Sequence, residues 1–318
     1  MSDVPAVSVV IIPGNQRERA ARSLASVLDQ DGIEWAEVIL LDAANDGSPP
    51  LPRSDESAVR VVPRPQRGTY GGLRAEGTRL ARAPIVAFLE EHAIGLPGWL
   101  AAIEESLRSG EYAGASGEVH PLNPGEGISD AVALMNYARW LPPLQERGPS
   151  KLVVGHNSAY RRDDLLAFGD DLEHFLSCEV VLQWRLGARG RPFLINPDIR
   201  VAHLNETTVS AICKGYYLWN VSFGAGWSRA EDWSASRRAA QALGCPWWVV
   251  RRVVDIARTA RTKQHRRTLL RHLPAMLVAQ SAAAVGIAVG CTRGERSHAL
   301  RFADYELDQD RGPATSFT

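Results

Sequence analysis

A short apolar run followed by three ionisable side chains constrains the fold of this chain more than any other feature. Residues Ile85–Leu89 follow a proline and predict a buried central strand of an α/β sheet. Glu90, Glu91 and His92 come directly after this strand. Because open α/β sheets bind ligands at the carboxyl ends of their strands, the cluster predicts a site for a cation or a polar substrate. A solvated acidic turn is the alternative for these three residues taken alone.

Apolar runs and helical patterns alternate before this point in the chain. Buried strands are predicted, in chain order, at residues 7–12, 37–41, 59–62 and 85–89. Helices are predicted at Arg17–Gln30 and at Leu73–Ala83, the second one after a glycine-rich turn over residues 68–72. A strand, a helix and a strand in this order form a right-handed parallel crossover. The fold class is therefore α/β, with a mostly parallel sheet flanked by helices.

The charge of the chain changes sign along its length, although the formal net charge of its 318 residues is zero. Residues 1–210 carry 20 Lys and Arg against 28 Asp and Glu, and residues 211–318 carry 16 against 8. We therefore expect two parts, of which the basic second part can meet an anionic surface. Four cysteines without CxxC spacing, and no signal peptide before the first strand, predict a reducing, cytoplasmic setting.

The C-terminal part contains a basic segment and an uncharged one. Arg251–His272 has eight Lys and Arg against one Asp along an apolar stripe, the composition of a helix in a membrane interface. Residues 273–291 carry no formal charge and approach the length of a membrane span. Packing on the basic helix or on the domain formed by residues 1–210 is our first expectation for them, and interfacial insertion and spanning stay open. The acidic tail Asp304–Asp310 is expected to be solvated.

The order of several short segments resembles the family 2 glycosyltransferases. Residues 13–17 (PGNQR), 42–48 (DAANDGS) and 73–77 (LRAEG) stand where that family has segments like PTYNR, DDGSTDGT and ARNxG. Glu90-Glu91-His92 stand at the position of its Asp-x-Asp motif. Downstream, residues 153–162, 178–182, 185–190 and 195–203 match a GxN segment with paired arginines, a Glu-Asp-x-x-Leu segment, a helix end and a strand with a terminal histidine.

The resemblance covers residues 7 to about 205 and implies the GT-A fold. It implies that residues 1–210 form the nucleotide-sugar-binding and catalytic domain, and residues 211–318 a C-terminal helical region. The implied activity is that of an inverting, hexosyltransferase-type glycosyltransferase, which moves a sugar from a nucleotide diphosphate sugar to an acceptor. Glu179 stands at the position of the general base, and the preceding Cys178 is expected to be an inert thiol.

The resemblance also implies a divalent cation, Mn²⁺ or Mg²⁺, held by Glu90, His92 and His203. Imidazole ligands favour manganese over magnesium. The alternative is that His92 disables metal binding and that arginines or helix N-termini bind the diphosphate.

The implied donor is most often a uridine diphosphate sugar, and thymidine or guanosine nucleotides stay open. The implied nucleotide contacts are Pro13, Asn15, Asp42, Arg74 and Glu90. Asp42 can accept the imide hydrogen of uracil. The implied sugar or acceptor contacts are His156, Asn157 and Trp99.

Two alternatives to this function stay open. Ala75, His92 and Cys178 depart from family acids or amides, so the chain could be a catalytically degenerate nucleotide-sugar-binding partner protein. The arginine-rich segment could bind nucleic acid, but no recognised nucleic-acid fold accompanies it, and we expect no such partner. The acceptor is unidentified; a lipid-linked acceptor would place the protein at the inner face of the cell membrane. The patch Met135–Trp140 fits either an acceptor-covering lid or ordinary helix packing.

Overall fold

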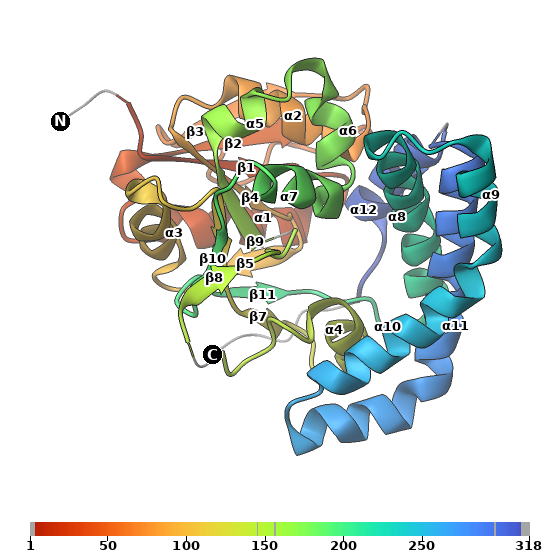
Figure 1. Ribbon diagram of the computed structural model, residues 1–318. Coiled ribbons are helices and arrows are strands. Elements are labelled where there is room, and N and C mark those ends of the chain that lie inside the picture. The colour runs from red at the N-terminus through yellow and green to blue at the C-terminus, as the bar shows by residue number, and fades with distance from the viewer. Residues whose placement is uncertain (1–3, 145, 156, 296, 313–318) are drawn as a thin grey trace. The chain divides into compact units, whose positions relative to one another are not determined.

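The computed structural model describes residues 4–144, 146–155, 157–295 and 297–312. The chain divides into two compact units, one of residues 1–120 and 142–203, and one of residues 121–141 and 204–318 (Figure 1).

The first unit is built on an eight-stranded sheet with the order β3-β2-β1-β4-β9-β6-β10-β8. Its strands are β1 Val7–Ile11, β2 Ala36–Asp42, β3 Val59–Pro63, β4 Ile85–Leu89, β6 Gly114–Ser116, β8 Gly148–Ser150, β9 Asn157–Arg161 and β10 Phe193–Ile195. β1 pairs in parallel with β2 and β4, and β2 with β3, whereas β9 runs antiparallel to β4 and β6. β1 and β4 are buried along their whole length, which explains their uninterrupted apolar runs.

Helices flank this sheet, as expected of an α/β fold. They are α1 Arg17–Leu28, α2 Tyr70–Leu80, α3 Trp99–Arg108, α5 Arg162–Leu166, α6 Leu172–Leu176 and α7 Glu179–Gly187, with short 3₁₀ turns at Ile33–Trp35 and Gly169–Asp171. α2 contacts β1 and β2, and α3 contacts β4, β6 and β9.

The helix α2 begins at Tyr70, three residues before the predicted start, so Gly71 and Gly72 of the glycine-rich segment belong to the helix and not to a turn. The Thr69 hydroxyl accepts a hydrogen bond from the Gly72 N–H and caps the helix. A side chain at Gly71 would collide with Ser177, at the end of α6. The glycine therefore permits close packing of two helices, which the sequence pattern does not distinguish from a turn.

A small second sheet of three short strands has the order β5-β11-β7. Its strands are β5 Ala93–Gly95, β7 Val119–Pro121 and β11 Val201–His203. β11 runs antiparallel to β5, and its register places His203 opposite Ala93.

The second unit is helical, as expected for the C-terminal region. Its helices are α4 Ser129–Tyr137, α8 Val209–Ala230, α9 Ala235–Leu243, α10 Cys245–Thr259, α11 Lys263–Arg293 and α12 His298–Asp308. α8 and α11 lie against each other over much of their length (Figure 1). A Cβ atom at Gly224, Gly286 or Gly290 would collide with the backbone of the facing helix. The two helices thus approach backbone to backbone.

One prediction for this unit is wrong and a second holds only in part. The basic segment Arg251–His272 is not one helix, because α10 ends at Thr259 and Thr262 caps a new helix by accepting a hydrogen bond from the His265 N–H. The acidic tail is solvated only in part: Asp304 and Asp310 are exposed, but Glu306 of α12 is buried, and Arg311 makes buried ion pairs of 2.6 Å with Glu206 and 3.1 Å with Glu306.

The patch Met135–Trp140 lies at the end of α4 and beyond it. Met135 belongs to a buried apolar cluster of the second unit that also includes Ile212 and Met276. The Asn136 side chain accepts a hydrogen bond from the Tyr216 hydroxyl. These contacts favour helix packing over a lid for this segment.

Candidate active site

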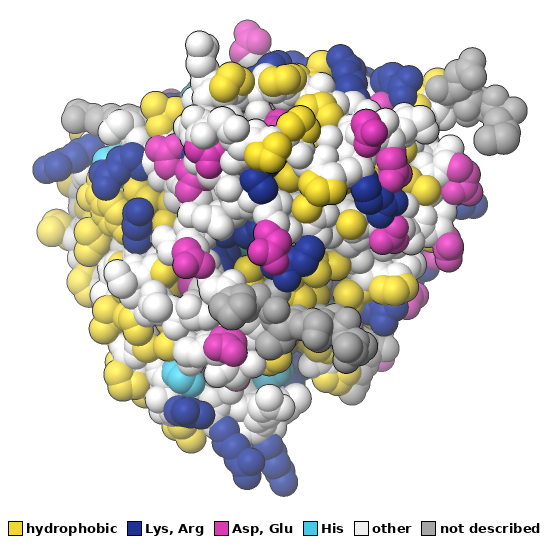
Figure 2. Space-filling model, turned by 180° about the vertical axis from the view of Figure 1, so that it is seen from behind, with side chains coloured by type: hydrophobic (Ala, Val, Ile, Leu, Met, Phe, Trp, Pro, Cys, Tyr) yellow, Lys and Arg dark blue, Asp and Glu magenta, His cyan; other side chains and the backbone are white. Residues whose placement is uncertain are grey.

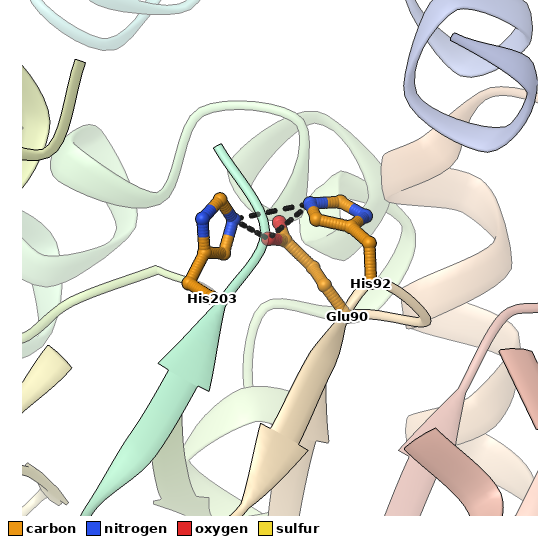
Figure 3. A group of neighbouring side chains, drawn as sticks. All are labelled: Glu90, His92 and His203. Carbon is orange, nitrogen blue, oxygen red and sulfur yellow. Dashed lines mark hydrogen bonds and ion pairs between the residues drawn. The ribbon is translucent and has the colours of Figure 1, made fainter. Parts of the chain in front are cut away.

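A tight turn between β4 and β5 sets the geometry of the candidate site. The Ala93 N–H donates a hydrogen bond of 2.9 Å to the Glu90 carbonyl, so residues 90–93 reverse the direction of the chain within four residues. β5 then pairs with β11, which brings His203 beside this turn. The side chains of Glu90, His92 and His203 converge as a result (Figure 3).

The three side chains form a cluster of donor atoms that fits a metal ion. The Nε2 atoms of His92 and His203 lie 3.1 Å apart, and each is 3.3 Å from Glu90 Oε2. Ions with ligand bonds of about 2.1 Å hold neighbouring ligands about 3.0 Å apart at right angles. Both imidazoles are buried and the carboxylate is mostly so. The sequence therefore identified a group of residues that the fold does bring together.

Glu91, between the two candidate ligands in sequence, has a different environment. It is buried and forms a two-pronged ion pair with Arg19 of α1, with distances of 2.7 Å from Nε to Oε2 and 2.5 Å from Nη2 to Oε1. Its Oε1 also lies 3.6 Å from His92 Nδ1. The solvated-turn interpretation of these residues is therefore wrong. A carboxylate behind a histidine is a common means of orienting a metal ligand.

A second buried arginine connects the cluster to the predicted base. Arg74 of α2 forms an ion pair with Glu179 through Nη1, and its Nη2 lies 3.5 Å from Glu90 Oε1. Burial would by itself lower the pKa of Arg74, but the attraction of Glu179, Tyr70 and Glu90 outweighs it and the pKa is raised. The guanidinium is thus held charged beside two carboxylates.

Glu179 is the first residue of α7, directly after the buried Cys178. A side chain at Gly155 would overlap the Glu179 carboxylate. Gly155, the glycine of the GxN segment, therefore provides the space that the carboxylate occupies. The sequence analysis gave Gly155 no role, although its motif position was a signal for one.

The ends of β1 and β2 carry the other predicted nucleotide contacts. Asp42 accepts two hydrogen bonds from Arg17, of 2.8 and 2.9 Å. Asn15 and Asn45 hydrogen-bond each other, and the Pro13 carbonyl accepts from the Ala43 N–H at 2.9 Å. The two strand ends are thereby tied into one edge. The role of these residues in nucleotide binding stays a prediction.

The predicted sugar or acceptor contacts are found in a different setting. Trp99 and Asn157 are buried, and the indole N–H donates a hydrogen bond of 2.8 Å to Asn157 Oδ1, which ties α3 to β9. Contact of either with a sugar stays a prediction. His156 lies outside the described residues.

Comparison with a solved structure identifies the class of fold. The protein resembles a crystal structure described as GalNAc-T7 with UDP, GalNAc and Mn2+, with a TM-score of 0.50 and 18% sequence identity. The match covers 63% of this chain and 43% of that one, so it spans less than half of the GalNAc-T7 chain. At this identity the likeness shows the fold alone, which is the GT-A-like fold of glycosyltransferases.

The family follows from the sequence. The family model of glycosyl transferase family 2 matches residues 8–167, which is half of the chain. The chain belongs to this family. No protein in a search of curated proteins matches it.

The buried ion pair behind the candidate site gives a first prediction. Replacing Arg19 by Met leaves the Glu91 carboxylate buried without its partner, so Arg19→Met is expected to lower the free energy of unfolding by about 3–5 kcal/mol. The double variant Arg19→Met, Glu91→Leu removes both charges and should recover most of that loss. Urea denaturation measures both. Equal stability of wild type and Arg19→Met would show that the pair does not hold the turn.

Proposed function

We propose that the protein is an inverting glycosyltransferase that uses a uridine diphosphate sugar, with Glu179 as the general base. The observation that carries this proposal is the convergence of Glu90, His92 and His203 at the ends of β4 and β11, with Glu179 connected to them through Arg74. Family membership supports a nucleotide-sugar donor and an acceptor.

In the proposed reaction an acceptor hydroxyl attacks the anomeric carbon of the donor. The new bond joins the acceptor oxygen to that carbon, the bond to the diphosphate oxygen breaks, and Glu179 takes the proton of the hydroxyl. Glu90, His92 and His203 would hold a divalent cation, which when bound neutralises charge on the leaving diphosphate. We infer Mn²⁺ from the two imidazoles, since the borderline ion accepts nitrogen ligands better than Mg²⁺ does. Asp42 would accept the imide hydrogen of uracil while remaining paired with Arg17.

A second candidate is a nucleotide-sugar-binding partner protein without transfer activity. The pairing of Glu179 with the buried Arg74 favours it, because an ion-paired carboxylate is a weaker proton acceptor. The two functions share donor binding and differ in turnover.

The metal site predicts a change in nucleotide affinity. Each of His92→Ala and His203→Ala removes one proposed ligand and is expected to weaken Mn²⁺-dependent UDP binding at least tenfold, on the order of the loss on altering a metal site. Calorimetry with and without Mn²⁺ measures this. His120→Ala is the matched control, because His120 pairs with Glu118 outside the cluster. Unchanged UDP affinity in excess chelator would contradict the metal site.

Turnover separates the enzyme from the binding protein. Release of UDP from a uridine diphosphate sugar in the presence of Mn²⁺ is expected for the wild type. Glu179→Gln should lower kcat by about 10²–10⁴-fold while leaving UDP affinity within threefold, since proton transfer contributes on that order to rate. Wild-type binding without measurable release would support the second candidate and remove Glu179 as a base.

The second unit supports a membrane-associated setting. Residues 237–293 carry eleven Lys and Arg against one Asp. Trp247 and Leu270 are 69% and 74% exposed, so large apolar side chains lie among these charges. Figure 2 shows hydrophobic side chains beside Lys and Arg side chains along its left edge and lower end. We propose that this surface binds an anionic membrane, where a lipid-linked acceptor is presented.

The helix α11 decides between lying on a membrane and crossing it. Within the described residues it is the helix that is long and apolar enough to span, and 44% of its apolar window is buried. The buried side packs on α8, and outward residues include Leu277, Val278 and Val285. A helix with one side already packed and arginines in its first turns suits an interfacial position. We therefore propose a peripheral protein at the inner face of the cell membrane.

Liposome binding tests this surface. The protein is expected to co-sediment with phosphatidylserine-containing vesicles but not with neutral ones, and to be released by salt, because each arginine adds on the order of 1 kcal/mol near such a surface. The binding should be lost when four arginines of α10, α11 and their connection are changed to Gln: Arg258, Arg261, Arg266 and Arg267. The control changes four exposed arginines of the first unit: Arg60, Arg108, Arg147 and Arg189. Failure of the wild-type protein to co-sediment with anionic vesicles at low salt would contradict the proposal.

A further inference from the structure

One guanidinium lies between the proposed cation ligands and the proposed base. Arg74 Nη1 pairs with Glu179 Oε1, and Nη2 lies 3.5 Å from Glu90 Oε1. The other oxygen of Glu90, Oε2, faces His92 and His203 at 3.3 Å each. Glu90 thus has one oxygen directed at the histidines and one at Arg74, and Arg74 is shared by two carboxylates.

The surroundings fix the position of this guanidinium. The Arg74 side chain is 4% exposed, and its Cζ lies 4.7 Å from the ring centre of Tyr70 and 5.3 Å from that of Phe88. A buried charge is weakly screened, so its interactions with neighbouring charges are strong. The Glu179 carboxylate lies against Gly155, where an added Cβ atom would overlap it. Glu179 is therefore held between the backbone at Gly155 and the guanidinium of Arg74.

A cation bound by Glu90 would act on Arg74 through two effects. It would repel the guanidinium, and it would draw the Glu90 charge toward the histidines. Both effects weaken the long contact between Arg74 and Glu90, whereas the close contact with Glu179 involves no proposed metal ligand. When a cation occupies the site, Arg74 would therefore keep its ion pair with Glu179 and lose its contact with Glu90.

We propose, in an inference that rests on the proposed function, that Arg74 is a positioning residue that couples the cation site to the base. It competes with the cation for Glu90, and it holds Glu179 in the place where the acceptor proton is taken. Because Arg74 contacts both Glu90 and Glu179, a change at Arg74 is expected to alter cation affinity as well as turnover. The two changes should have opposite signs.

This opposition separates positioning from a merely structural role. Removal of the Arg74 charge takes away repulsion and frees Glu90, so the cation should bind more tightly. The same removal leaves Glu179 without its partner, so kcat should fall. A residue that merely supports the fold would weaken both when it is replaced.

The experiment compares Arg74→Met with Arg74→Lys, using Mn²⁺ alone as the ligand. The Kd of Mn²⁺ is measured without donor from the spin-resonance signal of free Mn²⁺, and kcat is measured with saturating donor. Arg74→Met should lower the Kd about tenfold, the order of effect of one nearby like charge, and lower kcat at least tenfold. Arg74→Lys keeps the charge and should keep the Kd within threefold of wild type. Arg64→Met is the matched control, because Arg64 pairs with Glu76, which lies on α2 as Arg74 does, outside the cation cluster.

Other outcomes overturn the proposal. A Kd for Mn²⁺ that is unchanged or higher in Arg74→Met would exclude competition for Glu90, and an unchanged kcat would exclude positioning of Glu179. If Arg74→Met does not fold, the double variant Arg74→Met, Glu179→Gln removes both charges, and its Kd is compared with that of Glu179→Gln. A wild type that binds Mn²⁺ but transfers no sugar would overturn the proposed function and the positioning of a base, while tighter Mn²⁺ binding by Arg74→Met would still support the competition.

Discussion

The pairing of two three-residue strands is the interaction on which the candidate site depends. His92 and His203 are 111 residues apart in the chain, and the antiparallel register of β5 and β11 brings them to the same place. Because side chains alternate along a strand, a shift of one residue would direct His203 to the opposite face. The tight turn at residues 90–93 gives the same precision to Glu90 and His92. Backbone hydrogen bonds, rather than side-chain packing, thus align the three donor atoms.

Several acidic groups in and around the candidate site are each matched by an arginine. Asp42 is paired with Arg17, Glu91 with Arg19, and Glu179 with Arg74. A buried carboxylate without a partner would be costly, so the arginines allow negative charge to be concentrated around the candidate site. The arginines also fix the direction of each carboxylate before any ligand arrives. The same contacts therefore compensate the negative charge and preorganise the carboxylates.

The sequence predicted what depends on local pattern. The buried runs at β1 and β4 identified the sheet, and the order of short motifs identified the family and the cluster of Glu90, His92 and His203. It did not predict the arginine partners, because Arg19 and Glu91 are 72 residues apart and no local pattern connects them. The burial of Glu306 in the acidic tail was not predicted either, because it depends on the packing of α12 against α8, which no local pattern shows.

The glycine contacts between α8 and α11 have a consequence for the medium in which the second unit can persist. At Gly224, Gly286 and Gly290 the two helices touch backbone to backbone. Attraction at such distances comes from dispersion between closely fitted surfaces, which does not require that water be expelled. A helix pair joined in this way keeps its attraction when the outer side of one helix exchanges water for acyl chains. The same fold can therefore serve in two solvents.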